Sequence, residues 1–270
     1  MASGVDDVDG AGARTAGSVN ALVRFCARRD VPVLTREAVV GALGGVADVA
    51  VLFGGSVLGG ADVFAAGVRD GIARHSLVVG GQGHTTDVLR REVADRLGWR
   101  DVAEATEADL FERYLRERHG IAVDLLERTS TNCGSNVTAA LALLRERGVP
   151  HERLVLVQDA TMQQRMDAGL RRHAPSTRIV NHASHRTLVE HADGVLRYVD
   201  PPVGMWPLQR YVSLLLGEVD RLTDDAHGYG PAGRGFVAHV DVPAEVHRAA
   251  AHLRAHGGFT ARAADPRWAG

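Results

Sequence analysis

Four short apolar segments of this chain each end in a polar loop rich in glycine, hydroxyl or amide groups, and a helical pattern follows each loop. The segments with their loops are ADVAVLFGGS, HSLVVGGQGHTT, IAVDLLERTSTNCGSN and RLVLVQDATMQQR. Apolar runs without polar alternation are typical of strands buried on both faces of a parallel sheet. Because the carboxyl ends of parallel strands share one edge of the sheet, we expect the four loops to line one crevice. The repeat therefore predicts an open α/β sheet with a ligand site at that edge.

The same patterns place the expected elements along the chain. Strands are expected at Val49–Phe53, Leu77–Val79, Ala122–Leu126, Leu154–Val157 and Arg178–Asn181. Helices are expected at Val19–Arg29, Thr35–Leu43, Asp62–Ile72, Thr86–Leu97, Glu107–His119, Asn136–Arg147, Met162–His173, Leu208–Leu222 and Ala244–His256. The segment VAHVDVP alternates apolar and polar residues and predicts a further short strand that stops at Pro243.

These elements divide the chain into four parts. Residues 1–17 are acidic and rich in Gly and Ala, which predicts a disordered tail. Residues 18–46 are expected to form N-terminal helices, residues 47–190 the sheet domain, and residues 191–270 a helical C-terminal extension with one short strand. A proline-rich joint at residues 201–207 precedes the first long helix of this extension. We interpret the helical run Leu208–Leu222 as a helical cap or an oligomer element.

Composition narrows the class of ligand. Lys and Arg number 31 against 33 Asp and Glu, a net charge of −2 without a dense basic block, so we expect no nucleic-acid partner. The two cysteines, Cys26 and Cys133, lack metal-ligand spacing and exclude a disulfide scaffold. Neither a long apolar run nor a signal-peptide pattern occurs, which predicts a cytoplasmic protein without membrane contact. A small polar molecule is the expected partner.

The first loop supplies flexible backbone beside a hydroxyl group. Gly54 and Gly55 let backbone N–H groups approach a ligand, and Ser56 adds a hydroxyl. The loop FGGSVLGG lacks the G-x-G-x-x-G spacing, so a standard dinucleotide site is not expected. A tight strand-to-helix turn without a ligand is the alternative interpretation of this loop.

The second loop, residues 80–86, combines three glycines with several polar side chains. Gly81 and Gly83 free the backbone, while His84 is a candidate acid or base because the ordinary histidine pKa lies near 6.5. Thr85 and Thr86 either contact the ligand or cap the helix that follows. This loop has more chemistry than a plain turn requires.

The third loop, residues 129–136, holds four hydroxyls and two amides between a buried strand and a helix start. Helix N-termini attract carboxylates and phosphates. Thr131 and Asn132 are therefore candidate ligand contacts, and Ser135 and Asn136 either contact the ligand or cap the helix. A nucleophilic role for Cys133 is disfavoured because no histidine lies close to it in sequence.

The fourth loop begins with Gln158 and Asp159. Thr161 and Gln164 have the spacing of a capping box, which predicts a structural role for Thr161. Arg165 lies one helical turn further on, where it either reaches an anionic ligand group or pairs with Asp159.

Three histidines follow the fifth expected strand, at positions 182, 185 and 191. Their spacing matches no compact set of metal ligands, and no Cys or acidic residue stands in register with them. We therefore expect no metal site and interpret these histidines as solvated surface residues.

These loop motifs, together with SLLLGEVDRLTDDAHGYGPAGRGFVAHVDVP, resemble the YdcF protein family, which is related to the SanA and ElyC envelope proteins. The similarity extends from Ala47 to Val246. It implies a Rossmann-like α/β domain, an open and mostly parallel sheet flanked by helices, with a helical C-terminal part. It also implies binding of S-adenosylmethionine at the strand ends. The SanA and ElyC branches are membrane-anchored, and we expect no such anchor here.

The resemblance also implies site residues, position by position. They are Gly54, Gly55, Ser56, Gly81, Gly83, His84, Asn132, Asn136, Asp159 and Arg165. The loops themselves add Thr131, Ser135 and Gln158 as candidate contacts. Relatives in the wider family often carry a Glu before the position of Asn136 and a His three residues before that of Arg165. This chain has Ser135 and Met162 there, so the resemblance does not carry over the acid–base chemistry of those groups.

Three classes of function remain open at this point. The first is binding of S-adenosylmethionine or a related adenosyl ligand, with a transferase reaction in which His84 acts as base and Asp159 faces the sulfonium. The second is hydrolysis or transfer of a phosphoryl group on a small molecule, because glycine-rich loops at helix starts suit phosphate equally well. The third is a non-catalytic ligand sensor, a homodimer through its C-terminal helices.

Overall fold

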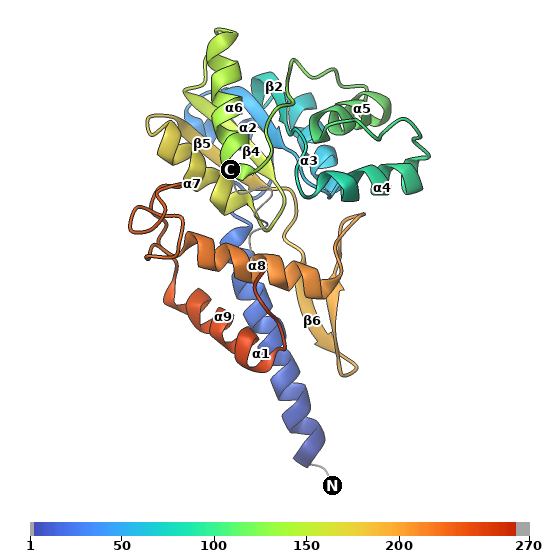
Figure 1. The fold of residues 1–270 in the computed structure, drawn as a ribbon, viewed down its shortest axis with the longest axis vertical. Coiled ribbons are helices and arrows are strands. Elements are labelled where there is room, and N and C mark those ends of the chain that lie inside the picture. Colours follow the sequence, from blue (N-terminus) through green and yellow to red (C-terminus); the bar gives the residue numbers. More distant parts are fainter. Residues whose placement is uncertain (1–2, 263–270) are drawn as a thin grey trace.

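A five-stranded parallel sheet forms the centre of the computed structural model, which describes residues 3–262 (Figure 1). The strands are β1 (Ala47–Phe53), β2 (Ala73–Val79), β3 (Leu125–Glu127), β4 (Arg153–Gln158) and β5 (Arg178–Ala183). Their order in the sheet is β3-β2-β1-β4-β5, and every neighbouring pair is parallel. The prediction of an open parallel sheet is confirmed.

Helices cover both faces of this sheet. The helices on one face are α2 (Arg36–Leu43), α3 (Gly59–Arg69), α4 (Thr86–Leu97) and α5 (Glu107–His119), and those on the other are α6 (Cys133–Glu146) and α7 (Gln163–His173). The fold is therefore Rossmann-like. β1 and β4 are neighbours, but the helices that follow them lie on opposite faces. Their loops diverge for this reason, and a crevice opens at their carboxyl ends.

The central strand shows why the apolar runs are continuous. All seven residues of β1 are buried. Ala50 and Leu52 belong to the core beneath α3 and α5, whereas Val49, Val51 and Phe53 belong to the core beneath α6 and α7. Side chains alternate between the two faces of a strand, and here neither face meets solvent.

A second part of the molecule, which we call the helical subdomain, lies below the sheet in Figure 1. Its elements are α1 (Ser3–Cys26), α8 (Leu208–Leu222), α9 (Ala244–His256) and the hairpin of β6 (Leu188–Ala192) and β7 (Val195–Val199). These elements share one hydrophobic core. Because α1 comes from the start of the chain and α9 from its end, the two ends build this subdomain together.

The predicted disordered tail at residues 1–17 is wrong where the structure describes it, because residues 3–17 belong to α1. Ala16, Val19, Val23 and Cys26 form a buried stripe at helical spacing. The stripe packs in the core shared with α8, α9 and β6. Composition alone suggested disorder because the surface that covers this stripe lies at the other end of the chain.

The predicted short strand in VAHVDVP is also wrong. Val237 and Val240 are buried beside α7 and α8, but no strand of residues 3–262 pairs with this segment. The strands near the extension are those of the β6–β7 hairpin, which the sequence analysis missed. Its turn, Asp193–Gly194, has φ values of 54° and 76°. An Asp-Gly pair suits this turn because two-residue type I′ turns require positive φ at both positions.

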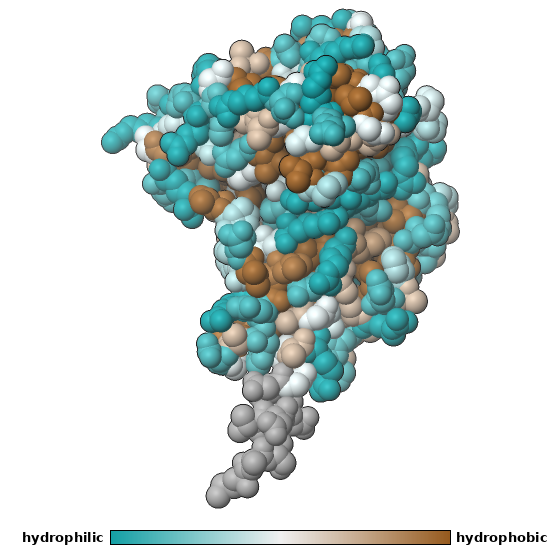
Figure 2. Space-filling model, turned by 180° about the vertical axis from the view of Figure 1, so that it is seen from behind, coloured by the Kyte–Doolittle hydropathy of each residue, from teal (hydrophilic) through white to brown (hydrophobic). Residues whose placement is uncertain are grey.

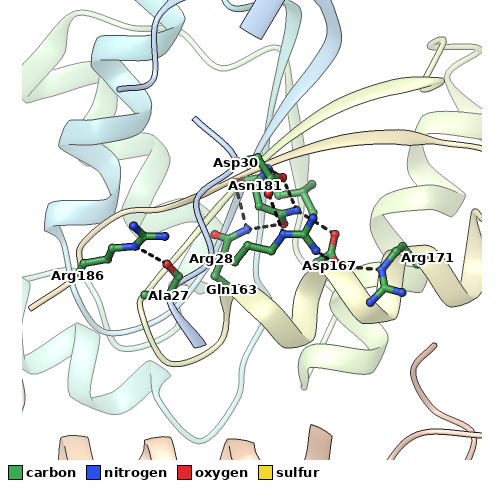
Figure 3. Close-up of polar contacts among 9 residues, drawn as sticks. Ala27, Arg28, Asp30, Gln163, Asp167, Arg171, Asn181 and Arg186 are labelled. Atoms are coloured by element: carbon green, nitrogen blue, oxygen red, sulfur yellow. Dashed lines mark hydrogen bonds and ion pairs between the residues drawn. The ribbon is translucent and has the colours of Figure 1, made fainter. Parts of the chain in front are cut away.

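A polar network joins the end of α1 to α7 and β5 (Figure 3). Asp167 of α7 is 1% exposed and accepts hydrogen bonds from Arg28 at 2.8 Å, Arg171 at 2.9 Å and Asn181 at 2.9 Å. Asn181 also donates to Asp30 at 2.9 Å. A buried carboxylate with three donors is well compensated for its lost hydration. The network fixes α7, which begins at the crevice, against the helical subdomain.

The outer surface is largely hydrophilic on the face opposite to that of Figure 1, with apolar patches between the polar regions (Figure 2). Within residues 3–262, no helix has both the length and the apolar character needed to cross a membrane.

Candidate functional site

The crevice at the strand ends is bounded on its other side by α8, and its empty space, open solvent at its mouth included, is about 590 Å³. All four predicted loops contribute to its lining. The predicted site residues that line it are Gly54, Gly55, Ser56, Gly81, Gly83, His84, Thr131, Asn132, Asn136 and Asp159. Three other predicted residues do not line it, namely Ser135, Gln158 and Arg165.

Gln158 lies behind the crevice and ties together the ends of β1 and β4. Its Nε2 donates to the backbone oxygen of Gly54 at 2.9 Å, and its Oε1 accepts from the backbone N–H of Asp159 at 2.6 Å. The side chain is buried. Gln158 therefore positions the first and fourth loops relative to each other rather than contacting a ligand.

The third loop is shaped by the start of α6. Asn132 is the N-cap and accepts from the backbone N–H of Ser135, whose hydroxyl in turn accepts from the backbone N–H of Asn132. Ser135 therefore completes a capping box from the third helical position. The N-cap of α6 is Asn132, not Ser135 or Asn136 as predicted. The side chain of Asn136 takes no part in this capping box, and Asn136 lines the crevice.

Glu107, which the sequence analysis did not single out, is a buried acid in the crevice wall. It is the first residue of α5 and is 6% exposed. Its Oε1 accepts hydrogen bonds from Thr85 at 2.7 Å and Thr86 at 3.0 Å. Burial raises the pKa of Glu107 to about 7, although the two threonine hydroxyls act in the opposite direction. A carboxyl with this pKa exchanges protons at neutral pH.

Two glycines make room for Glu107. A Cβ at Gly54 would collide with Glu107 Oε2, and a Cβ at Gly80 would lie 2.9 Å from Glu107 Cβ. These glycines of the first two loops therefore leave the space that the buried Glu107 side chain occupies. Thr85 and Thr86 do not cap α4 with their side chains, because their hydroxyls bind Glu107.

Asp159 is the second buried acid of the crevice. Its Oδ1 accepts from the backbone N–H of Thr161 at 2.8 Å and from the Thr161 hydroxyl at 2.6 Å. Burial raises the pKa of Asp159, and these hydrogen bonds oppose that shift. The predicted capping box of Thr161 and Gln164 is wrong. α7 begins at Gln163, and its N-cap residue, Met162, makes no capping hydrogen bond with its side chain.

His84 is half-buried and faces a cation. Arg262 Nη1 donates to His84 Nε2 at 2.9 Å. Burial and the nearby arginines, Arg262 foremost, lower the pKa of His84 to about 4. His84 is therefore neutral at pH 7, with its Nε2 already occupied as an acceptor.

Arg165 neither lines the crevice nor pairs with Asp159, the two alternatives that its position suggested. Its guanidinium binds Glu218 of α8 through two hydrogen bonds, of 2.6 and 3.0 Å. Burial by itself would lower the pKa of Arg165, but its charge interactions with Cys133 and Glu218 outweigh that effect and raise the pKa. This ion pair joins α7 to α8 and so holds the helical subdomain over the crevice.

The helical subdomain supplies a wall of the crevice that sequence reasoning missed. Its lining residues are Trp206, Arg210, Leu214 and Arg262. Trp206 Nε1 donates to the hydroxyl of Ser56 at 2.8 Å, which connects this wall to the first loop. No local signal in the sequence marks these residues, because they come from outside the strand-end loops.

Burial shifts the pKa of Cys133 and of two of the three histidines. Burial raises the pKa of Cys133, whose sulfur lies 3.7 Å from that of Met162. His182 and His185 are 3% and 8% exposed, so the expectation that they are solvated is wrong for both. Their pKa values fall to about 4 through burial. Across the part of the chain that the structure describes, no three His, Cys, Asp or Glu side chains are placed to hold a metal ion.

Gly81 allows the second and third loops to meet, and its replacement by alanine tests that contact. A Cβ at Gly81 would collide with the Ser130 backbone oxygen and lie 2.7 Å from that of Arg128. Backbone atoms cannot rotate away, so we expect Gly81→Ala to lower the free energy of unfolding by about 1–3 kcal/mol in urea denaturation. Gly41→Ala is the control: it is a helical position with open space around a new Cβ, and the substitution should be neutral or stabilising. Equal effects at the two positions would contradict the contact.

Comparison of the chain with models of known protein families gives no match. The site is therefore interpreted from its own chemistry. The crevice combines two buried carboxyl groups, Glu107 and Asp159, with two arginines, Arg210 and Arg262, and glycine-lined backbone. Such a site is able to bind a small polar molecule with charged groups and to exchange a proton with it at neutral pH.

Proposed function

We propose that this chain is a YdcF-like protein that binds S-adenosylmethionine, or a related adenosyl ligand, in the crevice at the strand ends. The observation that carries the proposal is the presence of both charges in one crevice. Glu107 and Asp159 line it at the strand ends, and Arg210 and Arg262 line it on the side of the helical subdomain. S-adenosylmethionine carries a cationic sulfonium and an anionic carboxylate, which call for these two kinds of partner.

The lining of the crevice is compatible with this ligand. Trp206 and Leu214 offer apolar surface for the adenine ring, and Asp159 would face ribose hydroxyls or the sulfonium. Arg210 and Arg262 would hold the carboxylate.

A transferase reaction would use the chain's own acid–base groups. When bound, S-adenosylmethionine supplies an electrophilic methyl or aminocarboxypropyl group. Glu107 is suited to accept the proton that an acceptor loses, because a pKa of about 7 leaves it partly ionised at neutral pH. His84 is a weaker base, with a pKa of about 4 and its Nε2 bonded to Arg262. We therefore assign the base in this proposal to Glu107 rather than to His84.

Calorimetric titration with S-adenosylmethionine and with S-adenosylhomocysteine, which lacks the sulfonium charge, tests the proposal. We expect both to bind at one site per chain. Asp159→Asn should weaken binding of the sulfonium ligand about 10-fold more than binding of the neutral one, because a charge partner is lost. The control Asp95→Asn, at an exposed position of α4, should change neither affinity. If neither ligand binds the wild-type chain, the proposal is wrong.

Hydrolysis of a phosphorylated small molecule is the second candidate. It is favoured by the two crevice arginines, which form no ion pair within residues 3–262, and by the start of α6 at the crevice. A panel of phosphoesters that includes p-nitrophenyl phosphate tests this candidate by the release of phosphate. We expect Glu107→Gln to abolish that release if the reaction occurs in the crevice; unchanged release in the variant would place it elsewhere.

A further inference from the structure

Four arginines on the α8 side of the crevice, Arg165, Arg210, Arg221 and Arg262, lie close enough to His84 to lower its pKa. Glu218 is 2% exposed and accepts hydrogen bonds from Arg165 and, at 3.1 Å, from Arg221. Arg210 and Arg262 stand beside this group and line the crevice, and neither forms an ion pair in the part of the chain that the structure describes. This side of the crevice therefore carries an excess of positive charge.

Without a bound ligand, this excess of positive charge raises the free energy of the folded chain. Arg210 Nε is shielded from solvent and has no hydrogen-bond partner among the described residues. Burial lowers the pKa of Arg262, and the neighbouring cations Arg221 and Arg210 lower it further. Buried donors and charges are normally paired in folded proteins. Among residues 3–262, these two arginines have no anionic partner.

The surrounding contacts aim Arg262 at the crevice without neutralising it. Its backbone N–H donates to Ser213 of α8 at 3.0 Å, and its backbone oxygen accepts from Arg221 at 3.1 Å. Its guanidinium donates to His84 across the crevice wall. Because His84 is neutral at pH 7, it orients Arg262 and leaves the charge available. Arg210 reaches the same wall from the first turn of α8.

We propose that Arg210 and Arg262 form an anion subsite that binds a carboxylate or phosphate group of the crevice ligand, with His84 as the residue that positions Arg262. Guanidinium groups suit both anions because their N–H groups match two oxygens at once. If the ligand is S-adenosylmethionine, the bound group is its amino-acid carboxylate, and this assignment rests on the proposed function. The subsite itself follows from two crevice arginines that form no ion pair within residues 3–262.

Ligand pairs that differ in one anionic group test the subsite in calorimetric titrations. S-adenosylmethionine and its decarboxylated form differ in the carboxylate, and AMP and adenosine differ in the phosphate. We expect the wild-type chain to bind the anionic member of a pair about 10-fold more tightly or better. Arg210→Gln and Arg262→Gln should remove most of that preference while changing the affinity for the other member by less than about twofold.

Two further variants separate the subsite from general effects of charge and folding. Arg248→Gln removes the same charge from an exposed position of α9 and should preserve the preference. Arg210→Lys keeps the charge but loses the two-oxygen geometry, so it should retain part of the preference. Circular dichroism and thermal melting of each variant show whether it is folded; Arg210→Lys keeps the test usable if Arg262→Gln does not fold.

The outcomes separate the subsite from the proposed function. Wild-type binding of S-adenosylmethionine with an anion preference that Arg210→Gln leaves intact would overturn the subsite and leave the proposed function standing. If neither form of S-adenosylmethionine binds, the proposed function is wrong. The titrations with AMP and adenosine then decide whether the anion subsite exists. Tighter binding of AMP than of adenosine that depends on Arg210 would support the subsite, whereas equal affinities, or no binding of AMP, would overturn it.

Discussion

Replacement of Asp167 by alanine is expected to lower the free energy of unfolding by about 3 kcal/mol. Asp167 is 1% exposed, and its carboxylate accepts hydrogen bonds from Arg28, Arg171 and Asn181 (Figure 3). The variant loses all three charge-assisted bonds and leaves the Asn181 amide with fewer partners in a buried site. Urea denaturation at pH 7 measures the change. Because the loop that leads into α7 carries Asp159 in the crevice lining, loosening of this network should also weaken ligand binding in the crevice.

The matched control for this variant is Asp87→Ala. Asp87 forms an ion pair with Arg90 on the surface of α4, and its side chain is 75% exposed. Exposed pairs of this kind contribute less than about 1 kcal/mol because solvent screens them. If the two variants lose the same free energy of unfolding, the network around Asp167 does not hold α7 in the way inferred above.

Replacement of Glu107 by glutamine is expected to change the pH dependence of stability. Burial raises the pKa of Glu107 from an ordinary value of 4.5 to about 7. Between these pH values the folded chain binds more protons at Glu107 than the unfolded chain does. The free energy of unfolding of the wild type therefore falls as the pH rises from 4.5 to 7. Glutamine has no charge to bury and avoids this loss. The free energy of unfolding of the variant, relative to wild type, should therefore rise by about 3 kcal/mol between pH 4 and pH 8.

Urea denaturation of wild type and Glu107→Gln at several pH values measures this difference. Glu117→Gln serves as the control, since Glu117 is an exposed residue of the same helix paired with Arg113. Its difference from wild type should stay within about 0.5 kcal/mol over the same range. A constant offset for Glu107→Gln at every pH would mean that folding leaves the pKa of Glu107 at its ordinary value, and it would remove the reason for assigning Glu107 as the base.

Local patterns were sufficient for several elements of the fold. The helices Thr86–Leu97, Glu107–His119, Leu208–Leu222 and Ala244–His256 have the predicted bounds. Their ends carry local signals, such as the Thr106 cap of α5 and Gly98 with φ of 69° after α4. The sequence pattern predicted a strand at Ala122–Leu126, whereas β3 is Leu125–Glu127. Asp124 lies outside the strand because its carboxylate accepts a hydrogen bond of 2.7 Å from the Ser76 hydroxyl.

The candidate site was predictable only where its residues follow the strands. Ten predicted residues line one crevice because the carboxyl ends of parallel strands share an edge. Glu107 was missed because an acidic residue in the first turn of a helix is ordinary in sequence, where it complements the helix dipole. Its burial against Gly54 and Gly80 depends on how α5 packs on the sheet, which no local pattern records.

The sequence by itself determined the parallel sheet, the order of its helices and the edge at which polar loops meet, because these follow from periodicity and turn residues within short windows. Only the tertiary structure decided that α1 is ordered by α9, that Arg165 pairs with Glu218 instead of facing the crevice, and that Arg210 and Arg262 stand in its wall. These features join residues distant in the chain. Their energies come from burial and charge pairing across elements, which exist only once the helical subdomain has packed over the strand ends.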